Sequence, residues 1–220
     1  MKYDIQDLHV SPYPPNEEIA NTLTHGIGII LSGLGLYLLF VEANQIGDPW
    51  KIWSSLIFGS CMIIGYSCST LYHASTNPKF KHQMRIADHI GIYLMIAGTY
   101  TPFLLVNLRG WIGWTFFILI WGCAFSGICL RIINKHVPNY ISVGPYLFMG
   151  WLVIIGIKPL YDSIGITGLS LVVLGGVFYS IGVGFYSSER IPFNHAIWHI
   201  FVLAGSISHY LAISLQVIPS

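Results

Sequence analysis

The sequence predicts an all-α membrane protein, a bundle of seven transmembrane helices with its N-terminus in the cytoplasm. Hydrophobic residues make up 54% of the 220 residues and charged residues only 9%, whereas an average soluble domain carries roughly 25% charged residues. The apolar residues gather in runs that are long enough to cross a bilayer, and nearly all charged residues lie between these runs. The basic residues between the runs are divided unequally between the two sides of the membrane.

A helix needs about 20 apolar residues to cross the hydrocarbon core of a bilayer. Seven stretches meet this requirement, at 20–41, 52–77, 86–108, 110–130, 137–157, 163–188 and 191–218. Six of them contain no Asp, Glu, Lys or Arg, and the third contains only Asp88.

The connections between these runs are short and carry the charges, the prolines and most of the turn residues. Turns are expected at 47–49, 77–79, 109–110, 134–138, around Asp162 and at 189–194. The chain is therefore predicted to be a single transmembrane domain over 1–220, in which 1–18 form a short cytoplasmic segment.

The orientation follows from the lysines and arginines of the connections. Seven lie on the side of the N-terminus, at positions 2, 79, 81, 85, 131, 135 and 190, and three lie on the other side, at 51, 109 and 158. Because basic residues favour the cytoplasmic side, the protein is expected in the cell membrane with its N-terminus inside.

Composition also excludes several classes of protein. Nineteen charged residues cannot cover a soluble globule of this size, and a net charge of +1 gives no reason to expect a nucleic-acid partner. All four cysteines fall within apolar runs and none forms a CxxC pair, so neither disulfides nor a cysteine metal site is expected.

Ionisable residues inside the spans are the candidate functional residues, because they are costly to bury in a membrane. In the predicted topology, His25, His73, Asp88, His195 and His199 all reach one depth near the N-terminal side. His209 lies closer to the middle of the membrane. His25 and His89 are expected to make interface or helix-end hydrogen bonds, with His25 near the site.

The spacing of these residues indicates a metal site. His195 and His199 are four residues apart and therefore share a helix face, and Ser69 and His73 have the same relation. Three neutral histidines with one open position form the kind of site that holds catalytic zinc. We therefore expect Zn²⁺ at His73, His195 and His199, with Asp88 and Ser69 acting on a water or on a substrate carbonyl. Isolated packing histidines remain the alternative.

At these residues the chain resembles the hemolysin III branch of the progestin and adipoQ receptor family, and in particular its bacterial members. The resemblance extends from about residue 16 to 215 and is carried by four motifs: Glu17-Glu18-x-x-Asn21-x-x-Thr24-His25, Ser69-x-x-x-His73, Asp88-His89-x-x-Ile92-Tyr93 followed by 97–102, and His195-x-x-x-His199. It implies seven helices, a cytoplasmic N-terminus, zinc held by the three histidines, Asp88 beside the zinc-bound water and Ser69 supporting the site.

Two functions remain in view. The first is a zinc-dependent hydrolase of lipid amide or ester bonds, similar in chemistry to a ceramidase, with a membrane lipid or its acyl chain as the substrate. The second is a membrane-perturbing (cytolytic) protein or membrane regulator with structural zinc, as the family name suggests. An ion channel is disfavoured, because six spans contain no acidic or basic residue that could line a pore. A retinal protein is disfavoured as well, because the seventh span has no lysine to form a Schiff base.

Overall fold

The computed structural model describes residues 13–133, 139–188 and 190–219, and no strand occurs within these ranges. The α-helices are α1 (Pro15–Ile46), α2 (Pro49–Ala74), α3 (Pro78–Pro102), α4 (Trp111–Ile133), α5 (Asn139–Trp151), α6 (Ile157–Tyr186) and α7 (Asn194–Gln216). A π-helical turn, η2 (Phe103–Asn107), follows α3, and a 3₁₀ turn, η3 (Leu152–Gly156), separates α5 from α6. The prediction of an all-helical membrane protein is confirmed.

Local sequence sets the first three helix starts. Proline occupies the first turn of α1, α2 and α3, where its missing N–H costs no hydrogen bond. The Asp48 side chain accepts a hydrogen bond from the backbone of Trp50, and the Asn77 side chain caps α3 in the same way. Gly47 ends α1 with φ at 77°, a conformation that suits glycine.

The observed helix starts differ from two of the predicted boundaries. Residues 78–85, expected to form a connection, are the first turns of α3, because Asn77 and Pro78 start the helix before the apolar run begins. Likewise, α1 begins at Pro15, before the apolar run, so Glu17 and Glu18 belong to its first turn. Residues 1–12 and the turn expected at 134–138 lie outside the described residues.

Six helical stretches of the described chain are long and apolar enough to cross a membrane. The fifth, Val143–Tyr186, has 44 residues and combines α5, η3 and α6. Its backbone breaks at Gly165, where φ is 64° and ψ is −175°. The turn expected around Asp162 is therefore wrong in position, because that residue is helical and the sharp break comes at the nearby glycine that can adopt a positive φ.

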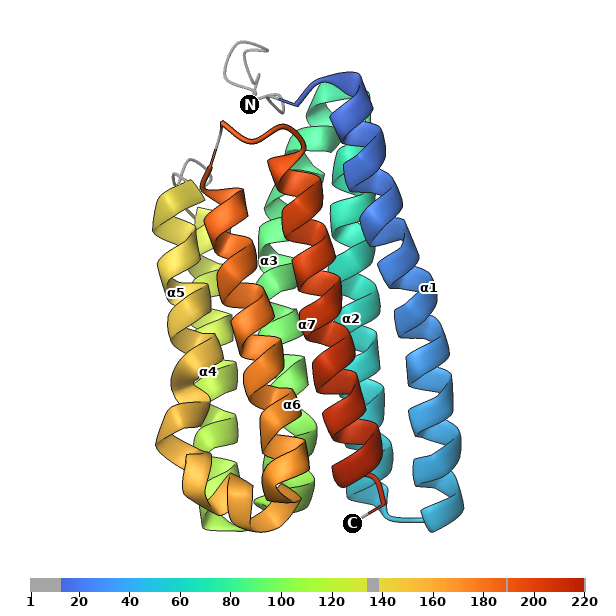
Figure 1. Cartoon of the computed structure of the whole chain (residues 1–220), viewed down its shortest axis with the longest axis vertical. Helices are drawn as coiled ribbons and strands as arrows, with labels where there is room; N and C mark the ends of the chain where they lie inside the picture. Colours follow the sequence, from blue (N-terminus) through green and yellow to red (C-terminus); the bar gives the residue numbers. More distant parts are fainter. Residues whose placement is uncertain (1–12, 134–138, 189, 220) are drawn as a thin grey trace.

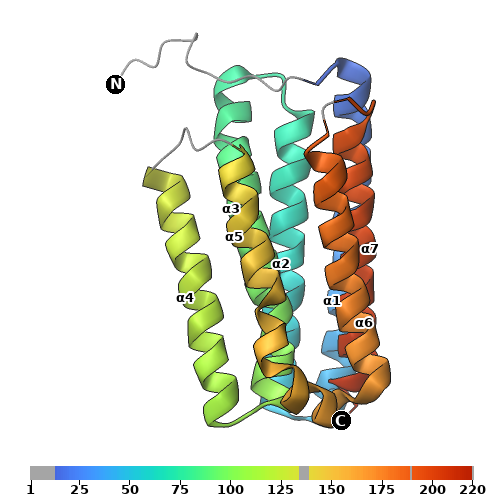
Figure 2. The same ribbon diagram turned by 60° about the vertical axis from the view of Figure 1, so that its left-hand side comes forward.

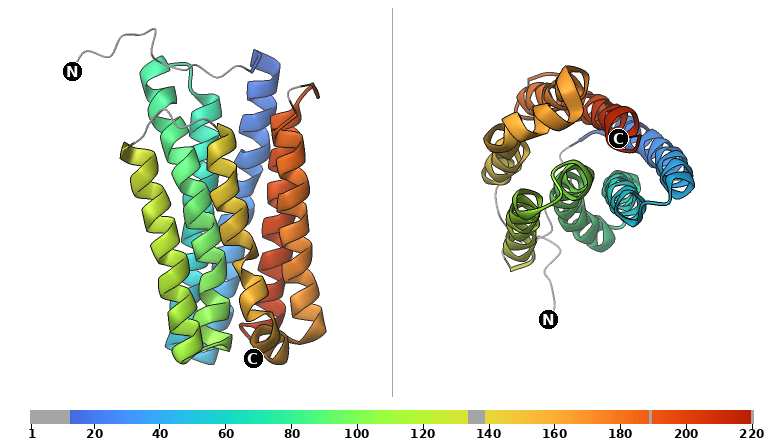
Figure 3. Two further views of the ribbon diagram at one scale, coloured as in Figure 1. Left: turned by 90° about the vertical axis from the view of Figure 1, so that its left-hand side faces the viewer. Right: turned by 90° about the horizontal axis from the view of Figure 1, so that it is seen from below.

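The helices lie roughly parallel or antiparallel to one another along the long axis of the molecule (Figure 1). The starts of α1, α3, α5 and α7 lie at the same end as the ends of α2, α4 and α6 (Figures 1 and 2). The C-terminus lies at the opposite end (Figure 3). Large apolar side chains such as Ile30, Trp111 and Ile133 are exposed on the outside, as expected for surfaces that face lipid.

Two buried clusters hold the bundle together. The larger joins α1, α2, α3, α6 and α7 around residues such as Phe58, Tyr66 and Val202, and the smaller joins α3, α4 and α5 around Tyr93 and Ile120. Helices α2 and α3 approach so closely that a Cβ added at Gly91 would lie 2.9 Å from the Gly65 Cα. Small residues allow such contact where no hydrophobic effect drives helices together in lipid.

Candidate metal centre

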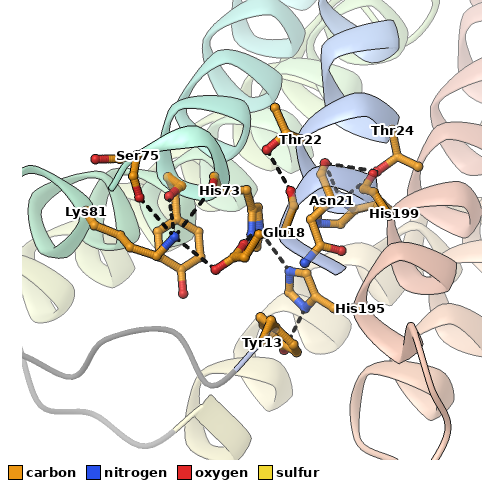
Figure 4. A network of polar contacts seen from close by, with 12 residues as sticks. Tyr13, Glu18, Asn21, Thr22, Thr24, His73, Ser75, Lys81, His195 and His199 are labelled. Atoms are coloured by element: carbon orange, nitrogen blue, oxygen red, sulfur yellow. Dashed lines mark hydrogen bonds and ion pairs between the residues drawn. The ribbon is translucent and has the colours of Figure 1, made fainter. Parts of the chain in front are cut away.

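Three histidines from two helices meet at the end of the bundle where α1 begins. His73 lies in the last turn of α2, and His195 and His199 lie in the first two turns of α7. One ring nitrogen of each lies within 4.8 Å of those of the other two, and all three residues are buried. The structure thus brings together the three residues that the sequence predicts as metal ligands (Figure 4).

The Nδ1 atom of each histidine is engaged by a group outside the cluster. His73 Nδ1 lies 2.6 Å from Glu18 Oε2, and His195 Nδ1 lies 3.1 Å from the Tyr13 hydroxyl. His199 Nδ1 lies 3.0 Å from the Thr24 hydroxyl and 3.2 Å from the Asn21 carbonyl oxygen. Each imidazole therefore turns its other nitrogen, Nε2, toward the cluster.

These partners determine where the ring protons are. A carboxylate accepts only, so His73 donates from Nδ1 to Glu18 and its Nε2 keeps a lone pair. His73 Nε2 lies 3.1 Å from His195 Nε2, and this contact is a hydrogen bond when His195 carries its proton on Nε2. Burial raises the pKa of the Tyr13 phenol, so the hydroxyl stays protonated and donates to His195 Nδ1.

The same contacts fit a metal ion with one tautomeric change. If the His195 proton moves to Nδ1, where the Tyr13 oxygen accepts it, all three Nε2 atoms present lone pairs to one point. Three imidazoles in this arrangement are a common zinc donor set. A second group that holds the remaining N–H of each ligand is also typical of such sites, because it fixes the orientation of the ring.

Glu18 is a site residue to which the sequence reasoning assigned no role. Its carboxylate accepts from His73 and also pairs with Lys81 Nζ at 2.9 Å. The Lys81 ammonium in turn donates to the carbonyl oxygens that end α2, including those of Tyr72 at 3.1 Å and Ser75 at 3.3 Å. The signal was available in the Glu17-Glu18 pair that precedes the first apolar run, but only the fold shows which of the two reaches His73.

Among the described residues, neither Asp88 nor Ser69 makes a hydrogen bond to the three histidines. Both line a cavity of about 410 Å³ whose wall also includes His195 and His199. From this polar end the cavity passes along mostly apolar side chains such as Met95 and reaches Leu160 near the start of α6. Its volume falls within the usual range of ligand pockets, about 300–1,000 Å³.

Of the other histidines in the spans, His89 and His209 make ordinary hydrogen bonds, whereas His25 makes none with the described residues. His209 donates from Nε2 to the Val172 carbonyl, and His89 donates to the Arg85 carbonyl one turn earlier. His25 was expected to make ordinary hydrogen bonds, yet neither of its ring nitrogens has a partner in the described part of the chain. Its ring instead stacks on that of His199 because both sit where α1 crosses α7.

Comparison with known proteins gives a consistent result. A family model described as Haemolysin-III related matches residues 13–210. The chain is 47% identical over 197 residues to a protein named Hemolysin-3 homolog from Bacillus subtilis (strain 168), covering 90% of this chain and 92% of that one. It is 45% identical to Hemolysin-3 of Bacillus cereus, with 93% of each chain covered. A human protein named Monocyte to macrophage differentiation factor is 29% identical over 90% of this chain and 83% of its own length.

Proposed function

The chain belongs to the haemolysin-III-related family, and we propose that it is a zinc-dependent hydrolase of lipid amide or ester bonds. One observation carries this proposal: three buried imidazoles converge at the polar end of a long, mainly apolar cavity. A metal site with a purely structural role has no need of such a cavity. A zinc-dependent hydrolase of acyl lipids needs both a metal site and an apolar cavity for the acyl chain.

His73, His195 and His199 would hold the zinc ion, with Glu18, Tyr13 and Thr24 fixing the three rings. Zinc held by three protein ligands with an open position polarises a carbonyl and makes water a stronger nucleophile near neutral pH. The residues of this chain supply the rest of the chemistry.

Asp88 is proposed as the general base. Asp88 lines the same cavity as His195 and His199, and it lies in the N-terminal half of α3, which starts at the end of the bundle where the cluster lies (Figure 1). It takes a proton from the attacking water, and it returns that proton to the leaving amine or alcohol. Ser69 lines the same cavity and would support this site.

The cavity determines the class of substrate. Its walls come from all seven α-helices and from η2 and η3, and they consist chiefly of apolar side chains such as Ile92, Phe103 and Leu147. An acyl chain fits such a lining and excludes bulk water from the reacting group. The partners of this protein are therefore membrane lipids, and soluble substrates would rarely reach the site.

The decisive substitution is Asp88→Asn, which leaves every proposed metal ligand in place. Loss of a general base usually lowers the rate by about 10²–10⁴-fold, so release of fatty acid from a long-chain amide or ester should nearly cease while zinc remains bound. Asp162→Asn, an exposed carboxylate near the opposite end, is the matched control. If the wild type releases no fatty acid from any lipid in nanodiscs, the hydrolase proposal fails.

We also propose that α5 and α6 are separate spans, which makes seven in all, and that the N-terminus is cytoplasmic. A straight helix of 44 residues would be about 66 Å long, roughly twice the hydrocarbon thickness. In a background without the native cysteines, Lys79→Cys should react with a membrane-impermeant maleimide only in inside-out vesicles, and Lys158→Cys only in intact cells. The reverse pattern would overturn the orientation.

A second function is supported by the names of two relatives at 45% and 47% identity, Hemolysin-3 and Hemolysin-3 homolog. In that case the protein would perturb membranes, and zinc would only stabilise the bundle. Lysis of erythrocytes by wild type and by Asp88→Asn separates the two, because equal lysis by both proteins would favour this second function.

A further inference from the structure

One face of α3 follows the cavity along most of the bundle. The lining residues of α3 and η2 recur every three or four positions, which places them on one side of the helix, as in the series Asp88, Ile92, Met95, Thr99 and Phe103. Because a helix rises about 1.5 Å per residue, the stripe from Asp88 to the next lining residue, Leu104, is about 24 Å long. This length exceeds half of the hydrocarbon core, which is about 30 Å thick, so a chain that fills the cavity would pass the bilayer midplane.

The far end of the cavity is closed where η3 joins α5 to α6. This turn lies at the opposite end of the bundle from the start of α1 and the histidine cluster (Figure 1). Leu104 and Leu160 line the cavity there and are only 4% and 3% exposed, so they are shielded from the surroundings of the molecule. Gly156, the last residue of η3, also lines the cavity and is buried. A Cβ added to Gly156 would lie 3.7 Å from the ring of Phe116, another lining residue.

We propose that Gly156 and Phe116 limit the length of the acyl chain that the cavity accepts, an inference that rests on the proposed function. With the reacting carbonyl beside Asp88, the distance to the closed end is about 24 Å. An extended chain advances about 1.2 Å per bond, since three backbone bonds of a polypeptide span about 3.3–3.6 Å, so the chain that fits best has about 20 carbons.

The cavity distinguishes chain lengths by packing and not by hydrophobicity, because the lipid tails outside it are equally apolar. A chain that is too short leaves a void beside Gly156 and Phe116 and loses the dispersion contacts available there. A chain that is too long must fold back or withdraw its carbonyl from the cluster, since packed interiors tolerate extra methylene groups poorly. Occupancy should therefore be greatest at one chain length and fall on both sides of it.

Two substitutions at this one contact should have opposite effects. Gly156 has a negative φ of −101°, which other residues also adopt, so Gly156→Leu places a side chain toward Phe116 and shortens the cavity. Phe116→Ala removes the ring that closes the same end and lengthens the cavity. Gly122→Leu is the matched control, because Gly122 lies on the same helix as Phe116, is exposed, has open space around its Cβ in the described structure and does not line the cavity.

The test is photo-crosslinking with saturated fatty acids that carry a diazirine at the methyl end, in an even-numbered series from lauric to lignoceric acid. Each probe is irradiated with the protein in nanodiscs, and the labelled peptides are identified by mass spectrometry. In the wild type, the arachidic acid probe should label residues 152–160 most strongly, whereas the lauric acid probe should label the middle of the cavity near Thr99. Gly156→Leu should shift the strongest labelling of 152–160 to a probe shorter by about two to four carbons, since a leucine side chain is itself three bonds long.

Phe116→Ala should shift this labelling to longer probes, and Gly122→Leu should leave it unchanged. Opposite shifts cannot arise from general damage to the fold. If every probe labels 152–160 equally, or if the best probe is the same in the wild type and both variants, the length limit is wrong while the lipid cavity stands. If no probe labels any wall of the cavity, the proposed function fails as well. Should Gly156→Leu not fold, Phe116→Ala decides alone, and the absence of a shift toward longer probes overturns the inference.

Discussion

Replacing Glu18 with glutamine tests whether the partners of the histidines prepare the cluster for a metal. The carboxylate accepts a hydrogen bond from His73 Nδ1 at 2.6 Å, and its side chain is 15% exposed. Glutamine keeps an oxygen that can accept this hydrogen bond but loses the charge. A hydrogen bond to a charged group contributes about 1.5–3 kcal/mol and a neutral one about 0.5–1.5 kcal/mol. Because this bond also exists without the metal, only its strengthening on zinc binding changes the affinity; loss of such a partner typically weakens metal binding by about 10–100-fold, and partial exposure puts Glu18→Gln near the lower end of that range.

The affinity is measured by competition with a chromophoric chelator on detergent-solubilised protein. Glu17→Gln is the matched control, because it changes the same chemical group one residue away, where no ion pair or hydrogen bond of the side chain is found in the described structure. Glu18→Gln should also lower the unfolding temperature of the zinc-free protein slightly, since Lys81 loses an ion pair but keeps its carbonyl partners. Equal zinc affinities of the two variants would refute the assignment of Glu18 to His73.

Three further outcomes are expected. Lys51→Met should reduce the free energy of unfolding by about 1.5–3 kcal/mol, because the buried ammonium donates a hydrogen bond to the Ile218 carbonyl at 2.8 Å. This contact lies at the end opposite the cluster, so zinc affinity should not change. Chemical denaturation in micelles measures the stability, and a change in zinc affinity would contradict the prediction. Gly91→Ala should destabilise the protein by about 1–3 kcal/mol, because the new methyl group meets the Gly65 backbone. Gly26→Ala should not, because the space around its Cβ is open. Equal unfolding temperatures of the two variants in a thermal-shift assay would argue against the close α2–α3 contact. Bound zinc should be lost progressively on acidification, because protons compete for the coordinating nitrogens. Metal analysis after dialysis at a series of pH values checks this, and a zinc content that does not change with pH would argue against a three-histidine site.

How much could be predicted from the sequence depended on the range of the interaction involved. Apolar runs are local, so the membrane class and most helix positions followed from counting them. Helix ends were less accurate where a cap outweighs hydropathy: Asn77 and Pro78 start α3 well before its apolar run, and Gly165, not Asp162, breaks the long fifth stretch. The helix cap and the glycine break are local signals as well, but each involves only a few residues, so each is lost when hydropathy is averaged over about twenty residues.

The residues of the candidate site also differ in how far they could be predicted from local sequence. His195 and His199 share a helix face because of their spacing alone, and the direction of each helix brings His73 to the same depth. Only the tertiary structure decides that Glu18, and not its neighbour Glu17, reaches His73 across 55 residues of sequence, or that Tyr13 meets His195 across 182. The rotation of each helix about its axis determines these pairs, and that rotation is set by the fit of many side chains against neighbouring helices. No single motif encodes it.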